Sequence, residues 1–379
     1  MEYNMKSKIF YKTMYCSLIG VTCISAVHAA DFKRFSVSAG WLHVMPQGKA
    51  NPFDISTSVP SGTKANVGQI SVPAFMSAVD PDATLPSTGE NAKDILDLVF
   101  KKPEGGGQSV GELLGFVDSE GNVTPVTSGV ATINGIDHWQ NEGSGLEADD
   151  VDTLGLTFNY YLNENVSLQF IGGIPPKVDI NGKGFIKAPL TGSAAPGGLA
   201  GSVIGDNLGL KKDIPITNLD AYGKAATVRA WTPALEAQYQ WGRAGINKFR
   251  PYVGAGVMYA HFSDIKLNSG IRSDLEAAGH MIQNIHDGQA GAALDGKKSS
   301  ANPVVDVDAD DAIAPIVTAG FTYDITPNWY TVASVSYAKL NNKATINVFD
   351  SNTNKQLIHA TTKMDIDPII TYLGVGYRF

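Results

Sequence analysis

The stretch KMDIDPIITYLGVGYRF (363–379) decides the fold of this chain. From Ile369 onward its side chains alternate between two faces: Ile369, Thr371, Leu373, Val375, Tyr377 and Phe379 on one, and Ile370, Tyr372, Gly374, Gly376 and Arg378 on the other. Successive side chains of a β-strand point to opposite faces, so the first face is apolar and ends in aromatic residues, whereas the second is small or polar. Such a strand fits a soluble sheet as well as a membrane barrel, and the rest of the chain has to distinguish them.

Length and composition narrow the possibilities. The chain has 379 residues, 40 glycines, only 17 % charged residues and a formal net charge of −8. This length fits two ordinary domains or one barrel with large insertions. After residue 30, no apolar run approaches the roughly 20 residues that a membrane helix needs. The negative charge argues against nucleic acid as a partner, for which a basic stripe is expected.

The first 29 residues are expected to be a secretory signal peptide, with a retained membrane anchor as the alternative. A basic start is followed by an apolar run and by small residues before the cleavage point at Ala30: Lys6, Lys8 and Lys12, then 14–26, then Val27-His28-Ala29. Both cysteines, Cys16 and Cys23, lie in this segment, so residues 30–379 are expected to have no disulfide and no thiol chemistry. An acidic, glycine-rich secreted chain without cysteine is typical of proteins outside the inner membrane of Gram-negative bacteria.

Strand-like alternation recurs along the whole chain. Eight strands are predicted, at about 35–46, 151–162, 166–180, 226–241, 249–266, 313–325, 329–345 and 361–379. Short turns alternate with long connections, which are expected on the extracellular side: 48–150, 182–224, 268–312 and 347–360. Helix-like pieces at 92–101 and 272–285 lie within two of them. An even strand number with short periplasmic turns and long outer loops predicts an all-β fold, an eight-stranded antiparallel transmembrane β-barrel.

Five segments resemble the OmpW family of outer-membrane proteins, which includes the AlkL-type alkane importers. They are AGWLHVMP (39–46), LGLTFNYYLNENVSLQF (154–170), PALEAQYQWG (233–242), FRPYVGAGVMYAHF (249–262) and DPIITYLGVGYRF (367–379). The resemblance covers all eight strands but not most of 48–150, 182–222 or 268–310. It implies a monomeric barrel with a narrow, partly hydrophobic interior, which passes small hydrophobic compounds inward and releases them sideways through the wall.

The periplasmic half of the barrel interior is expected to be closed by polar side chains. An eight-stranded barrel is wide enough only for side chains or one small ligand, which argues against a water-filled channel. The predicted polar plug consists of Gln169, Glu236, Gln238, Asp324 and Arg378. Because buried charges persist when they are paired, Arg378 is expected to bind Asp324 or Glu236. A purely structural network is the favoured interpretation of this plug.

The outer half of the interior is expected to be apolar. The predicted lining residues are Leu42, Val44, Ile171, Met258 and Phe262, and Ile174 joins them if Gly172-Gly173 form a bulge that shifts the register. This gradient fits a pocket that accepts an apolar molecule from outside, or side chains that simply fill a small barrel. Pro175-Pro176 and Pro233 remove hydrogen-bond donors from neighbouring strands, which predicts either a lateral exit or an ordinary strand end.

No catalytic, cofactor or metal site is predicted. The histidines are scattered without zinc spacing, and no nucleophile, base and acid stand together. The acidic run DVDADD (306–311) is interpreted as a solvated loop, with a Ca²⁺ or Mg²⁺ site that bridges lipopolysaccharide as the alternative. The aromatic end, Phe379, is expected to be recognised by the outer-membrane assembly machinery, as the resemblance to such barrels implies.

Two functional hypotheses remain. The first is an outer-membrane channel for passive uptake of small hydrophobic molecules, surrounded by membrane lipid and lipopolysaccharide. The second is a surface-exposed structural or interaction protein that contacts host molecules, phage or lipopolysaccharide without transport. The length of 48–150 is the main support for the second hypothesis.

Overall fold

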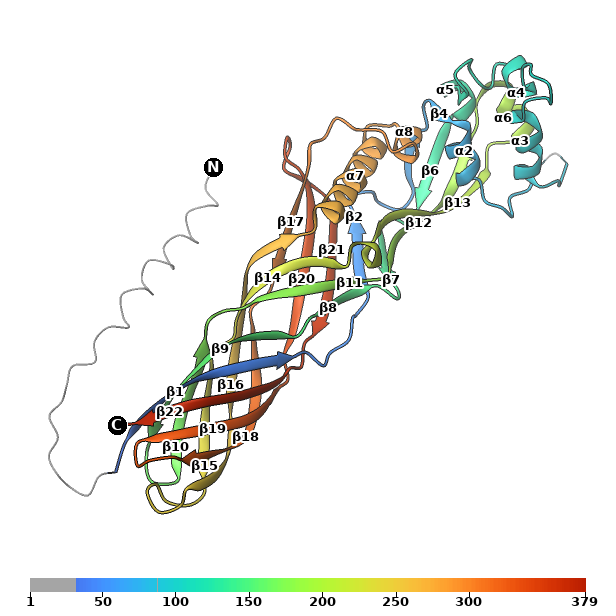
Figure 1. The fold of residues 1–379 in the computed structure, drawn as a ribbon. Coiled ribbons are helices and arrows are strands. Elements are labelled where there is room, and N and C mark those ends of the chain that lie inside the picture. Colours follow the sequence, from blue (N-terminus) through green and yellow to red (C-terminus); the bar gives the residue numbers. More distant parts are fainter. Residues whose placement is uncertain (1–31, 87) are drawn as a thin grey trace. The chain divides into compact units, whose positions relative to one another are not determined.

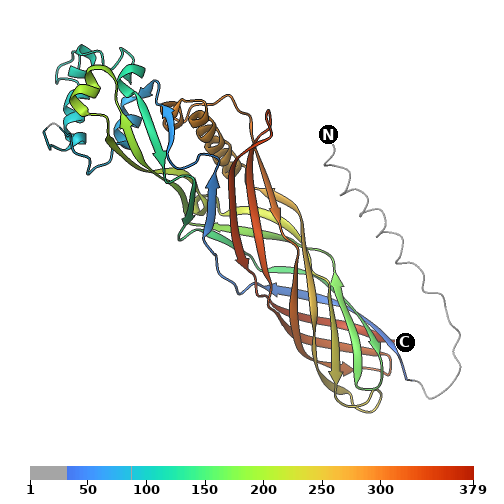
Figure 2. The ribbon, with the colours of Figure 1, turned by 180° about the vertical axis from the view of Figure 1, so that it is seen from behind.

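The computed structural model describes residues 32–86 and 88–379, so the predicted signal peptide lies outside the described residues. Part of the described chain forms a β-barrel (Figure 1). The barrel strands are β1 (Phe35–Met45), β9 (Val151–Tyr161), β10 (Val166–Gly173), β15 (Ala234–Gln240), β16 (Phe249–Leu267), β18 (Ala312–Asp324), β19 (Trp329–Ala338) and β22 (Ile369–Arg378). They pair antiparallel in this order, and β22 pairs with β1, which closes the barrel. The predicted eight-stranded antiparallel barrel is confirmed, and Figure 2 shows it from behind.

The outward face of the barrel is apolar and the inward face is small or polar. On β1, Val37 and Trp41 are exposed, whereas Ser36 and Ser38 on the opposite face of the strand are buried. Aromatic rings meet on the outside near the short turns: the ring centroids of Phe35 and Phe379 are 6.0 Å apart. This arrangement is the aromatic girdle expected at the periplasmic membrane surface.

Inward glycines make room for tyrosine rings inside the barrel. Three buried rings lie against glycines of a barrel strand, and we call these contacts the glycine sockets: Tyr252 on Gly320, Tyr330 on Gly376 and Tyr372 on Gly374. A Cβ atom on Gly376 would lie 2.2 Å from Cζ of Tyr330, and one on Gly320 would lie 2.8 Å from Cζ of Tyr252. A side chain at either position would force the neighbouring ring to move, so the rings favour glycine at these positions of the inner face.

Four of the predicted strands are each divided into two. The additional pieces are β11 (Lys177–Lys183), β14 (Lys224–Trp231), β20 (Asn341–Asp350) and β21 (Lys355–Asp365). Three of the four breaks contain proline, at Pro175-Pro176, Pro233 and Pro368. Proline has no backbone N–H to donate, so the ladder stops where it occurs and resumes beyond it.

The outer connections form a folded domain. The stretch 48–150, interpreted from the sequence as a loop with one helical piece, contains β2 (Phe53–Thr57), β3 (Thr63–Asn66), β4 (Ile70–Ser71), α2 (Val72–Ala78), α3 (Ala92–Phe100), α4 (Val110–Leu113), β5 (Asn122–Val123), α5 (Pro125–Ser128), β6 (Val130–Asn134), β7 (His138–Asn141) and β8 (Gly145–Ala148). The expected helix at 92–101 is present as α3. The strands were missed because they have two to five residues, too few to show a periodic pattern.

The other outer connections complete this domain. They contribute β12 (Phe185–Ala195), α6 (Gly198–Ile204), β13 (Leu208–Asn218), the 3₁₀-helix η1 (Leu219–Tyr222), α7 (Ser269–His286), α8 (Ala290–Leu294) and β17 (Pro303–Ala309). With 48–150 and the β20–β21 hairpin, these elements are called the outer domain. Its two main sheets have the orders β13-β12-β6-β3 and β17-β20-β21-β2-β7.

One hydrophobic core holds the outer domain together. Helix α7, expected from the sequence as a surface helix at 272–285, buries Ile271, Ile282 and Ile285 in this core. It contacts β13, β17, β20 and β21, so it joins the two sheets. Within 32–86 and 88–379, no helix is both long and apolar enough to cross a membrane.

Candidate functional site: a layered interior and an interrupted wall

The lowest layer of the barrel interior contains a buried ion pair. Arg378 on β22 donates from Nη1 to Oδ1 of Asp324 at the end of β18, over 2.6 Å, and both side chains are buried. The guanidinium carbon of Arg378 also lies 4.3 Å from the ring centroid of Tyr330. Of the two partners considered for Arg378 from the sequence, the structure has Asp324.

A second buried arginine, Arg250, is absent from the plug that the sequence predicts. It is 1 % exposed and donates from Nη2 to the carbonyl oxygens of Glu164, over 2.6 Å, and Gly242, over 3.3 Å. These carbonyls belong to two of the short turns, so Arg250 ties the turns to the barrel floor. The alternation of β16 could have identified it, because Arg250 shares the inward face of that strand with Tyr252.

The other three plug residues form a separate layer. Gln238 donates from Nε2 to Oε1 of Gln169 over 2.5 Å, and Thr318 donates to Oε1 of Glu236 over 2.6 Å. Gln238 also reaches Glu236 over 3.4 Å. The predicted plug therefore consists of two polar clusters: Arg378 with Asp324, and Gln169 with Glu236 and Gln238.

Two apolar layers lie above the polar clusters, one inside the barrel and one where the strands continue outward beyond it. The lower apolar layer consists of Ala234, Met258, Ile316 and Ala338, with Ile171 and Ile370 packed against it. The upper apolar layer consists of Val178, Ile180, Val228, Ala230, Ala260, Ala314, Leu340, Met364 and Ile366. It contains residues of β11, β14, β16 and β18, together with residues in or beside the β20–β21 hairpin.

The predicted lining residues are distributed over these layers. Ile171 and Met258 belong to the lower apolar layer, and Phe262 packs against the upper one. Leu42 instead packs against the tyrosines of the glycine sockets. Val44 is partly buried at the outer end of β1. The structure thus brings Ile171 and Met258 together and places Leu42 and Phe262 in other layers.

The conditional assignment of Ile174 to the interior is wrong. Gly172 and Gly173 stay in register with Leu156 and Gly155 of β9, without the bulge that the assignment required. The backbone N–H of Ile174 then donates to the carbonyl of Leu154, and its side chain is 57 % exposed on the lipid-facing side. A strand without an extra residue keeps its alternation, so Ile174 faces outward.

The barrel wall is interrupted beside the apolar layers. The ladder between β10 and β15 ends at the pair Ile171 and Ala234, and pairing resumes between β11 and β14 at Lys177 and Arg229. Between these points the two strands bond to their other neighbours and not to each other. Gly172 and Gly173 pair with β9, and the carbonyl of Pro233 accepts from the N–H of Tyr259. One backbone hydrogen bond of 3.1 Å, from Ala230 to Pro176, closes the upper end. We call this segment the seam.

The seam lies at the level of the apolar interior. Ile171 and Ala234, at its lower end, belong to or pack against the lower apolar layer. Val228 and Ala230, at its upper end, belong to the upper layer. The prolines noted in the sequence therefore coincide with an opening in strand pairing above the polar plug.

Comparison with known proteins identifies the family. The model of the OmpW family matches residues 120–293 and 291–379, which is more than half of the chain. The chain belongs to the OmpW family. Outer membrane protein W of Vibrio cholerae serotype O1 is 25 % identical over 268 residues, which are 70 % of this chain and 91 % of that protein. Outer membrane protein W of Escherichia coli strain K12 is 24 % identical over 237 residues, 62 % of this chain and 76 % of that protein.

A solved structure resembles this OmpW-family chain over most of its length. The crystal structure of the outer membrane protein OprG from Pseudomonas aeruginosa covers 92 % of this chain and 96 % of its own, with 16 % identity and a TM-score of 0.45. Family membership and the closed barrel place the chain in the outer membrane of a Gram-negative bacterium.

This OmpW-family barrel also carries two similar polar clusters on its outer rim. Asp152 accepts hydrogen bonds from Trp41 over 2.7 Å and pairs with Nδ1 of His43 over 2.8 Å. Asp311 accepts from Tyr259 over 2.6 Å and pairs with Nδ1 of His261 over 2.7 Å. The strand pairs β1–β9 and β16–β18 are half the barrel apart in the strand order.

Asp311 is the last residue of the acidic run DVDADD. Its hydrogen bonds to Tyr259 and His261 lower the pKa of the Asp311 carboxyl. In the part of the chain that the structure describes, no group of three or more His, Cys, Asp or Glu side chains is placed to hold a metal ion.

Proposed function

We propose that this outer-membrane barrel takes up small hydrophobic molecules passively and releases them sideways through the seam. The proposal rests on one observation: two features of the barrel lie at the same height along its axis. The interrupted pairing between β10 and β15 lies beside the apolar layers, and the polar plug lies below them. A molecule that reaches Met258 therefore has an apolar surface around it and a weak wall beside it.

Energetics favour lateral release over passage through the floor. The route downward requires disruption of the buried pair between Arg378 and Asp324, and removing one partner of such a pair typically costs about 3–5 kcal/mol. Lateral release keeps an apolar molecule away from water. The favourable free energy of keeping its surface out of water is about 25 cal/mol per Å² of apolar area. No cofactor or energy source is needed for such transfer down a concentration gradient.

The remaining partners follow from the membrane setting. The outward apolar face contacts membrane lipid, and the outer rim lies next to lipopolysaccharide. Phe379, which is 51 % exposed beside Phe35 on the outward face, is the aromatic residue that the outer-membrane assembly machinery would recognise. The pairing of β1 with β22 closes the barrel within one chain, so no second copy is needed to complete it.

One substitution tests the conduit directly. Ala234 is buried in the lower apolar layer at the seam, so A234F fills the space that the permeant would cross. Ala237 on the same strand is exposed on the outer face, so A237F is the matched control. We expect A234F to abolish uptake of a fluorescent hydrophobic tracer by cells, and A237F to leave it unchanged. Wild-type uptake by a correctly folded A234F barrel would contradict the proposal.

A second function is favoured by one observation: the outer connections have a hydrophobic core of their own. A folded domain outside the membrane suits a surface-exposed interaction protein that contacts a host molecule, a phage or lipopolysaccharide. Binding assays on the A234F protein separate the two functions. Surface binding retained when uptake is lost would assign adhesion to the outer domain.

A further inference from the structure

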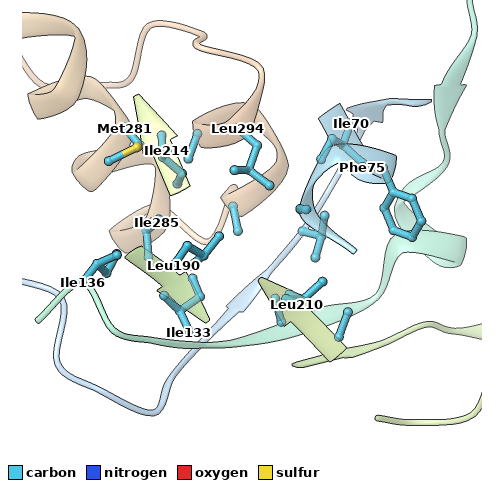
Figure 3. A pocket seen from close by; sticks show the side chains of 16 residues that line it. Ile70, Phe75, Ile133, Ile136, Leu190, Leu210, Ile214, Met281, Ile285 and Leu294 are labelled. Carbon is cyan, nitrogen blue, oxygen red and sulfur yellow. The ribbon is translucent and has the colours of Figure 1, made fainter. Parts of the chain in front are cut away.

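An apolar cavity lies in the outer domain, away from the barrel interior. It has a volume of about 40 Å³ and is bounded by α2, α7, α8 and the strands β6, β12 and β13. Figure 3 shows Ile70, Leu190, Leu210 and Ile285 around it. All its lining residues are apolar, and cavities of this kind stay dry because water finds no hydrogen-bond partner in them.

A second cavity lies against the same helix. It has a volume of about 50 Å³ and is lined by residues that include Phe53 of β2, Trp139 of β7, and Ile346 and Ile358 of the β20–β21 hairpin. The indole N–H of Trp139 is buried and has no hydrogen-bond partner among the described residues. Packing alone holds this ring in the cavity wall.

Among residues 32–86 and 88–379, Met281 on α7 alone lines both cavities. Methionine is unbranched and has three rotatable side-chain bonds, so it adapts to irregular spaces more easily than leucine or isoleucine. Rotation of Met281 would join the two cavities and add the volume that its side chain now occupies. Each cavity alone is smaller than the roughly 150 Å³ cavity, lined by Leu, Ile and Phe, that is known to bind benzene.

One hairpin connects this region to the barrel interior. Ile346 and Ile358 of β20–β21 line the second cavity, whereas Leu340 and Met364, at the base of the same hairpin, belong to the upper apolar layer. The apolar side chains of the hairpin therefore reach from the cavity to the outer end of the layered interior.

We infer that the outer domain contains a binding site for one small uncharged hydrocarbon of about benzene size, with Met281 as a movable partition between its two halves. The inference deepens the proposed function, because such a site would hold a permeant before it enters the barrel. Binding itself does not depend on transport, so the two can be tested separately.

Trp139 is a built-in reporter for this site. The other four tryptophans, Trp41, Trp231, Trp241 and Trp329, are exposed on the barrel surface. The experiment uses the full chain in lipid nanodiscs, with these four replaced by phenylalanine, and bromobenzene as a heavy-atom quencher. We expect saturable quenching of Trp139. The reverse protein, which carries W139F and the four barrel tryptophans, should show only non-saturable quenching from bromobenzene dissolved in lipid.

Variants of Met281 identify the partition. M281A should join the cavities and lower the apparent Kd by about tenfold, from the added cavity volume. M281F should fill the space and remove saturable quenching. L357A is the control, because Leu357 is buried in the same core and lines neither cavity, so it should leave the Kd unchanged. The volume-conserving M281L, which keeps the fold but stiffens the partition, should weaken binding.

Three outcomes decide the question. Non-saturable quenching of Trp139 in folded protein, or an equal response of the M281A and L357A proteins, would overturn the site. Saturable binding that persists in A234F while uptake is lost would support a site independent of the seam. Saturable binding in a wild-type protein that transports nothing would support the site and refute the proposed function.

Discussion

The barrel and the outer domain differ in how the sequence determines their strands. In the barrel each strand separates lipid from interior, so alternation along a single strand is enough to reveal it. In the outer domain a strand of five residues, β2, pairs with β21 about 300 residues away, as Ile55 does with Ala360. Local periodicity reports the two faces of a strand, but it contains no information about a distant partner.

The two regions also differ in what fills them. The barrel floor depends on a buried ion pair and on rings seated against glycines, whereas the outer domain has a hydrophobic core around α7. Each region should therefore fail through a different kind of substitution, and each failure should stay in its own region.

The largest effect is expected from breaking the ion pair of the floor. D324A leaves Arg378 buried without its carboxylate, which should lower barrel stability by about 3–5 kcal/mol. The double variant D324A/R378M should recover much of this loss, because it leaves no unpaired charge. Urea unfolding followed by the gel shift of the folded barrel measures both. Equal stability of the single and double variants would show that the pair is not the cause.

A large effect confined to the other region is expected from I282A. Ile282 is 0 % exposed in the core of the outer domain, and its truncation should cost about 2–5 kcal/mol. Hydrogen exchange should rise in α7 and in β20–β21, which contact each other, and stay unchanged in β1 and β22. Equal loss of protection in the barrel would show that the two regions unfold as one unit.

An intermediate effect is expected at a glycine socket. G376A places a Cβ against the ring of Tyr330 and should cost about 1–3 kcal/mol, the usual range for overpacking. Gly209 of the outer domain has ordinary contacts of 3.5 Å for an added Cβ, so G209A is the control. The gel-shift temperature of the folded barrel should fall for G376A alone. A smaller effect of G376A in the Y330A background than in the wild type would assign the loss to the ring contact.

The smallest effect is expected from a change of pH, which should alter the stability of the outer domain alone. Burial lowers the pKa of His280 and His286 on α7 below the ordinary value of 6.5, and nearby Lys298 and Lys355 lower it further. The unfolded chain therefore binds protons more readily, so stability present above pH 6.5 is lost as pH falls below it. H286Q should reduce this pH dependence in hydrogen exchange of α7. A slope unchanged by H286Q and by H280Q would exclude both side chains as its source.

Much of the barrel could be predicted from the sequence. Alternation identified the barrel strands, and inward parity predicted that Arg378 pairs with Asp324 or Glu236, of which the structure has Asp324. The prolines at 175–176 and 233 indicated either a weak seam or an ordinary strand end, and only the register of both neighbouring strands could show that pairing stops there. The same register decides that Ile174 faces lipid, because the sequence could not exclude a bulge at Gly172-Gly173.

The rest required distances between segments that are remote in sequence. Arg250 has the same inward parity as Arg378, but its partners are backbone carbonyls of two turns, which have no sequence signal. The cavities beside Met281 are lined by residues from β2 to β21, so no local pattern could indicate them. Short strands and non-local packing explain why the outer domain looked irregular.

The glycine sockets have a consequence for how the barrel closes. In the native register Tyr330 of β19 faces Gly376 of β22. A slip of two residues keeps every side chain on its proper face, so polarity alone does not penalise it. It would, however, bring Tyr330 opposite Arg378 or opposite Gly374, whose space Tyr372 already occupies. The fit of each tyrosine ring to its glycine therefore favours the native register when β19 pairs with β22. G376A should accordingly show a slower final phase of refolding into lipid than G209A.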